Sequence, residues 1–106
     1  LETFELPKSV TTIGLNAFSG CNKMTSVKFD PEAEIKEIGA GAFADCGLQG
    51  ISIPKKVEKI AKEAFRNCKV LEKIEVSEFT KSIDPEAFKH CDKLDDIKVS
   101  KDNKVY

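Results

Sequence analysis

The stretch "ISIPKKVEKIAKEAFRNCKVL", residues 51–71, decides the fold of this chain, because its pattern recurs along the whole sequence. Its central motif, Ala-Phe-x-x-Cys, occurs four times. The phenylalanines of the four copies stand 25, 22 and 23 residues apart, at Phe18, Phe43, Phe65 and Phe88. Repetition at such a period indicates a solenoid, in which each repeat forms one coil that stacks on its neighbours.

Apolar residues precede each Phe at regular intervals. In the quoted stretch they are Ile51, Ile53, Val57 and Ile60, and the alternation Ile-Ser-Ile predicts a short strand. The other copies repeat these columns as Phe4, Leu6, Val10 and Ile13, as Val27, Phe29, Ile35 and Ile38, and as Ile74, Val76, Thr80 and Ile83. The resulting repeats lie near 1–23, 24–47, 48–70 and 71–93, with a partial repeat at 94–106.

Two spacings depart from the underlying period of 23 residues. Val27 and Ile38 are eleven apart, whereas Ile51 and Ile60 are nine apart, so residues 30–34 contain a two-residue insertion. One residue is missing in the second copy, just after its cysteine. We expect the insertion to form the longest loop, as insertions in surface loops are tolerated.

Phe79 lies outside the register of the repeat, next to Thr80, which stands where the other copies have Val or Ile. A threonine is smaller than isoleucine and carries a hydroxyl group. We therefore expect Phe79 to turn inward and fill the space beside Thr80; an exposed contact residue is the alternative.

The pattern of residues 51–71 resembles the BspA-like leucine-rich repeats found mainly in bacterial surface proteins, and the resemblance covers essentially the whole chain. It implies an α/β fold: a single right-handed leucine-rich-repeat solenoid over residues 1–106, with parallel strands on the concave face and a short helical turn in each coil. Asp84-Pro85-Glu86 supports such a turn, because it combines an N-cap residue, a Pro and an acidic first turn.

Neither end of the sequence carries a polar cap, which repeat stacks need to cover their terminal coils. We therefore expect this solenoid to be part of a longer array. The alternative is end-to-end self-association through the uncapped repeats, because exposed strand edges pair readily.

Four cysteines, Cys21, Cys46, Cys68 and Cys91, each follow a repeated Phe by three residues. Stacking therefore arranges them as a ladder, with steps close to the strand spacing of about 4.8 Å. A tetrahedral zinc site needs sulfurs that converge on one metal ion, and a ladder spreads them apart. We predict free thiols buried in the core, since Cys packs as a small apolar side chain. Disulfides between adjacent coils are the alternative, because the expected Cα separations permit them.

Composition and motifs predict a protein without catalytic residues, metal or cofactor. The 106 residues include 17 Lys and Arg against 18 Asp and Glu, so a net charge of −1 gives no reason to expect nucleic acid. No apolar run is long enough to span a membrane. We find no phosphate-binding loop, paired-histidine signature or nucleophile elbow. His90 adjoins Cys91, but neighbours on a helical turn diverge by about 100°, so we expect His90 to face outward.

Outward-facing strand residues form the expected recognition surface of a solenoid. The candidate interaction face comprises Glu5, Ser26, Lys28, Gly50, Ser52, Lys73, Glu75, Asp96 and Lys98. Neighbouring coils carry opposite charges there, which favours a self-neutralised, solvated sheet. The competing interpretation is a shallow trough at Ser26, Gly50 and Ser52 on which a partner rests. These columns contain no aromatic residue, so we expect neither sugar nor single-stranded nucleic acid on this face.

The resemblance to the family implies a non-enzymatic protein-interaction module of a cell-surface or secreted bacterial protein, with a protein as its partner. Adhesion to host or neighbouring-cell proteins is the role that the family implies. The alternative is a structural spacer that displays another domain and has no ligand of its own.

Overall fold

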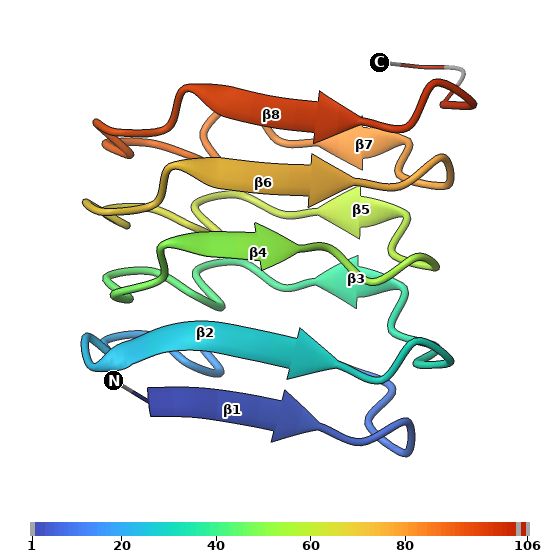
Figure 1. Cartoon of the computed structure of the whole chain (residues 1–106), viewed down its shortest axis with the longest axis horizontal. Helices are drawn as coiled ribbons and strands as arrows, with labels where there is room; N and C mark the ends of the chain where they lie inside the picture. Colours follow the sequence, from blue (N-terminus) through green and yellow to red (C-terminus); the bar gives the residue numbers. More distant parts are fainter. Residues whose placement is uncertain (1, 104, 106) are drawn as a thin grey trace.

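The computed structural model describes residues 2–103 and 105, with only the backbone of Glu2 and Asp96. The chain forms a β-solenoid of about four coils (Figure 1), with extents of 32 × 29 × 21 Å. Leu1, which we expected to open the first repeat, lies outside the described residues. The right-handed sense of the coil stays a prediction.

Each coil contributes its longer strand to one face of the solenoid. These strands are β1 (Glu2–Leu6), β2 (Met24–Phe29), β4 (Gly50–Ser52), β6 (Lys73–Val76) and β8 (Asp96–Val99). They pair in parallel as two separate sheets, β1-β2 and β4-β6-β8. The expected parallel strands are therefore present, but the ladder is interrupted between β2 and β4.

A third sheet, made of shorter strands, lies behind these two (Figure 1). It consists of β3 (Glu37–Ile38), β5 (Lys59–Ile60) and β7 (Ser82–Ile83), all parallel. Ile13 extends it through a bridge to Ile38. The repeated isoleucine column of the sequence is thus confirmed as a column of stacked residues.

The third side of each coil is a run of turns that carries the Ala-Phe-x-x-Cys motif. We expected a helical turn here, but the described residues contain no helix. Asp84 does accept a hydrogen bond from the Glu86 amide at 2.8 Å, as a cap would, yet no helix follows. The expected α/β class is therefore replaced by a β-solenoid.

Backbone hydrogen bonds explain why no helix forms. The Ala17 amide bonds the Gly14 carbonyl within its own coil at 3.2 Å, whereas the Phe18 amide bonds the Ala42 carbonyl of the next coil at 2.7 Å. The same inter-coil bond recurs from Phe43 to Ala64 and from Phe65 to Ala87, at 2.7 and 2.8 Å. An α-helix would direct all of these amides along its own axis and leave none for the next coil.

Residues in the left-handed backbone conformation produce this alternation between hydrogen bonds within a coil and hydrogen bonds to the next coil. The residue two positions after the repeated Phe has a positive φ in every coil, at Gly20, Asp45, Asn67 and His90. The residue two positions before it does so in three coils, at Asn16, Gly41 and Glu63. Gly, Asn, Asp and His adopt this conformation comparatively readily, whereas Glu63 adopts it against its usual preference, and a helix cannot continue through any of them.

The core is built from columns that run along the solenoid. The rings of Phe18, Phe43, Phe65 and Phe88 stack with centroids 5.3–5.4 Å apart and planes within 11° of parallel. Phe43 and Phe65 are fully buried. Stacked aromatic pairs contribute about 0.5–1.5 kcal/mol each beyond burial of their area, so this column helps to hold adjacent coils in register.

Phe79 does not fill the core as we expected. It is 45% exposed, and the Lys55 ammonium lies 5.9 Å from its ring centroid. Thr80 itself is fully buried, and its hydroxyl donates to the Val57 carbonyl at 2.8 Å. Thr80 therefore occupies the core position directly, because a hydrogen bond to the preceding coil satisfies its polar group.

The left-handed position of His90 leads to a testable prediction. His90 is exposed and has φ +64°, so His90→Gly relieves a backbone cost and should raise the free energy of unfolding by about 0.5–1 kcal/mol. The matched control, Lys89→Gly, lies at a position without positive φ and should lower it by a similar amount. Urea denaturation measures both, and an equal loss in the two variants would contradict the left-handed turn.

Candidate interaction face

The candidate residues lie on the outward side of the longer strands, which we call the strand face. Glu5 pairs in register with Lys28, and Thr3 with Ser26. In the sheet β4-β6-β8 the columns are Gly50, Lys73 and Asp96, and Ser52, Glu75 and Lys98. The predicted columns are therefore present within each sheet, whereas Ser26 is not paired with Gly50, nor Lys28 with Ser52. The side chain of Asp96 lies outside the described part of the chain.

The ion pairs among the described residues lie outside the candidate residues of the strand face. Ion pairs with N–O distances of 3.4–3.9 Å join neighbouring coils at Lys8–Glu32, Lys36–Glu58, Lys56–Glu34, Lys59–Glu37, Lys62–Glu86 and Lys69–Asp92. None of these includes a candidate residue. Among the described side chains, Lys28, Lys73 and Lys98 form no ion pair, although Glu5 and Glu75 are cross-strand neighbours of two of them. The expected self-neutralisation of this face therefore does not extend to ion-pair contact.

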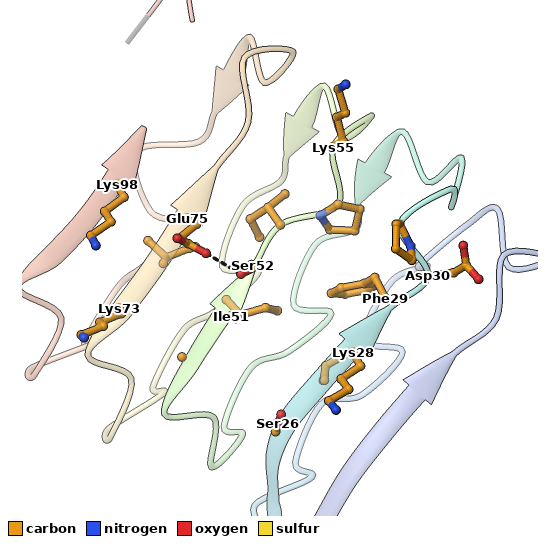
Figure 2. Close-up of a pocket in the computed structure, with 16 residues that line it drawn as sticks. Ser26, Lys28, Phe29, Asp30, Ile51, Ser52, Lys55, Lys73, Glu75 and Lys98 are labelled. Carbon is orange, nitrogen blue, oxygen red and sulfur yellow. Dashed lines mark hydrogen bonds between the residues drawn. The ribbon is translucent and has the colours of Figure 1, made fainter. Parts of the chain in front are cut away.

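The interruption between β2 and β4 shapes the surface. The two strands are close at their beginnings, where the Gln49 amide bonds the Thr25 carbonyl at 3.3 Å. Gly47 also lies so near the Asn22 carbonyl oxygen that an added Cβ would clash with it. Towards their ends the strands diverge, as Figure 2 shows. The missing residue near Gly47 tightens one end, and the insertion at residues 30–34 accompanies the opening of the other.

A groove of about 830 Å³ follows this divergence and continues across β6. Its lining includes seven of the nine candidates, at Ser26, Lys28, Gly50, Ser52, Lys73, Glu75 and Lys98. Phe29 lies between β2 and β4 in Figure 2 and packs against the core. The Ser52 hydroxyl donates to the Glu75 carboxylate at 2.6 Å. We did not single out Phe29 as a surface residue, since its register assigns it to the core.

The cysteines form a ladder of free thiols. The Cys46 thiol donates to the Phe18 carbonyl at 3.1 Å, and Cys68 and Cys91 donate to Phe43 and Phe65 in the same way, at 3.1 and 2.9 Å. Cys46 and Cys68 are buried, as predicted, whereas Cys21 and Cys91 are half-buried. Each such thiol therefore ties its coil to the preceding one.

Burial also suppresses the acidity of the central thiols. It raises the pKa of Cys46 from 9.0 to about 11. A hydrogen bond with Cys91, together with burial, raises the pKa of Cys68 well above its usual value. Because the thiolate is the reactive form, these two thiols are inert near neutral pH. His90, beside Cys91, is exposed, as expected.

We predict that thiol titration at pH 8 separates the four cysteines by position. The half-buried Cys21 and Cys91 should react first, whereas Cys46 and Cys68 should react only after unfolding, which should give four thiols per chain. Cys46 should remain slow even at pH 10, because a pKa of about 11 keeps its thiol protonated there. Rapid native modification of Cys46 or Cys68 would contradict the packing of the ladder.

The described residues contain no group of three or more His, Cys, Asp or Glu side chains that could hold a metal ion. They also contain no helix long and apolar enough to cross a membrane.

Parallel coils, stacked aromatic and cysteine columns and a polar strand face define a leucine-rich-repeat solenoid. Residues 1–106 match the family model described as "BspA type Leucine rich repeat region (6 copies)". The chain belongs to this BspA-type leucine-rich repeat family, which confirms the resemblance found in the sequence. It is a repeat protein of the bacterial surface-protein type. A search of curated proteins gives no significant match.

Solved structures share the fold. A leucine-rich cell-surface protein from Faecalibacterium prausnitzii superposes with a TM-score of 0.83 at 31% identity, over 94% of this chain and 26% of that one. The pneumococcal vaccine antigen PcpA superposes with a TM-score of 0.72 at 19% identity, over 96% of this chain and 31% of that one. A leucine-rich repeat protein from Bacteroides ovatus superposes with a TM-score of 0.53 at 22% identity, over 90% of this chain and 36% of that one. The last two show the fold alone. The chain thus spans roughly a quarter to a third of these proteins.

Proposed function

We propose that this chain is a non-enzymatic protein-interaction module of a bacterial cell-surface or secreted protein, and that its strand face binds a partner protein. Membership of the BspA-type family supports the surface location, as does the similarity to a protein described as a cell-surface protein. Adhesion to proteins of host or neighbouring cells is the role we propose for the module. We further propose that it is one segment of a longer array.

The observation that carries this proposal is a groove lined by lysines that form no ion pair with other described residues. Six exposed lysines elsewhere reach carboxylates of a neighbouring coil, whereas Lys28, Lys73 and Lys98 form no ion pair within the described part of the chain. Other exposed lysines, such as Lys81 and Lys93, form none with the described residues either, but they lie outside the groove. They surround a groove rather than a flat surface. Unpaired charges beside a hollow steer and orient a complementary partner.

A structural spacer is the second candidate. The in-register neighbours Glu5 and Lys28, and Glu75 and Lys98, favour it, because opposite charges on adjacent strands stabilise a sheet by about 0.2–1 kcal/mol per pair even without a ligand. A spacer requires only that the coils stack, so its behaviour would not depend on which side chains the strand face carries.

Charge reversal separates the two candidates. Labelled protein should bind saturably to epithelial or bacterial cells, and protease treatment of the cells should abolish this binding. Lys28→Glu with Lys98→Glu should weaken it at least about tenfold, since each reversal turns an attraction into a repulsion. The control, Lys81→Glu with Lys93→Glu, changes the net charge equally at exposed lysines outside the groove and should leave binding unchanged.

Two results would contradict the proposal. Absence of saturable binding to either kind of cell would favour the spacer. Equal loss in both double variants would show that net charge, rather than the strand face, governs attachment.

A further inference from the structure

The opening between β2 and β4 leaves backbone groups without strand partners. Along a strand, successive residues present their amide and carbonyl groups to opposite sides. The Asp30 amide donates to the Leu6 carbonyl of β1. The peptide groups of Lys28 therefore also point toward β1, whereas those of Val27 and Phe29 point toward β4. The Ile53 amide bonds Glu75 of β6.

By the same alternation, the peptide groups of Gly50 and Ser52 in β4 point into the opening, toward β2. The Gln49–Thr25 bond is the single backbone hydrogen bond that joins the two strands among the described residues. Both lips of the opening therefore present free peptide donors and acceptors, at Val27 and Phe29 and at Gly50 and Ser52. Such an edge is a template for another extended chain.

The charges around the opening are unbalanced. Four lysines, Lys28, Lys55, Lys73 and Lys98, line the groove with only two acids, Asp30 and Glu75, on a chain whose net charge is −1. Both acids are already engaged. Asp30 accepts the Glu32 amide at 2.8 Å, and Glu75 accepts the Ser52 hydroxyl at 2.6 Å. The lysines of the strand face have no such partner, so the groove favours a negatively charged occupant.

We infer that the opening between β2 and β4 binds an extended, acidic segment of a partner protein. The segment hydrogen-bonds through its main chain to the lip at Gly50 and Ser52, and its carboxylates face the groove lysines. This inference rests on the proposed interaction function of the strand face and specifies the chemistry of the partner. The peptide groups favour a polypeptide over a polysaccharide, which has no main-chain ladder to offer.

Amide NMR of the ¹⁵N-labelled chain tests the inference. The probe is a capped nine-residue peptide of alternating Glu and Val, which is acidic and favours the extended state. Saturable shifts are expected at the amides of Val27, Phe29, Gly50 and Ser52. Three comparison ligands share only part of its chemistry: the same peptide N-methylated at alternate residues, a Lys-for-Glu peptide and a heparin oligosaccharide. Each should bind at least about tenfold more weakly.

Two variants act on the groove by different means. Lys28→Glu with Lys73→Glu should weaken binding at least about tenfold, and Lys81→Glu with Lys93→Glu should not. Gly50→Val adds a side chain to the groove floor without changing charge. An added Cβ there meets the Lys73 carbonyl oxygen at 3.6 Å, an ordinary contact, so the fold should be retained while binding is lost.

Several results would overturn the inference. These are equal binding of the N-methylated peptide, equal binding of heparin, and no shift at the four amides at millimolar peptide. Shifts of these amides with protein concentration alone would assign the opening to a second copy instead. If the peptide does not bind while cell binding still depends on Lys28 and Lys98, only this inference is contradicted. If the peptide binds and no cell does, the adhesion proposal falls instead.

Discussion

Backbone hydrogen bonds between coils are the constraint on which this structure depends. A single coil buries too little apolar surface to be stable, so each must use its peptide groups to hold the next. On the turn side, alternate amides such as that of Phe18 bond the following coil. The aromatic stack and the thiol ladder reinforce the same step, because the carbonyl of each of the first three repeated Phe residues accepts the next coil's cysteine thiol.

This constraint explains which parts of the fold were predictable. Columns such as Ile38 and Ile60, or Phe43 and Phe65, recur in the sequence because stacked coils need the same residue at the same height. Their alignment followed from spacing alone. The helical turn did not, because Asp84-Pro85-Glu86 signals only how a turn begins. Whether the next amide bonds its own coil or its neighbour depends on backbone geometry that propensity does not encode.

The strand face was predictable to the same extent. Spacing identified Glu5 as a neighbour of Lys28 and Glu75 as a neighbour of Lys98, and the register agrees. It could not predict whether those charges touch, which depends on side-chain reach, or that β2 and β4 separate. The insertion at residues 30–34 was visible as a longer spacing, but an insertion can leave a sheet intact. Here it coincides with a shortened corner at Gly47, and the two irregularities together split the sheet.

This split removes strand pairing between two coils, and such pairing helps to stabilise adjacent coils of a repeat protein. Elsewhere between the longer strands the ladder is continuous. The chain tolerates the interruption because the other two sides of the same coils remain bonded, through Ile38 and Ile60 on one side and through Phe43 and Ala64 on the other. The strand face can therefore leave peptide groups open to solvent at modest cost, and an opening flanked by unpaired lysines is where this coil stack differs from a uniform one.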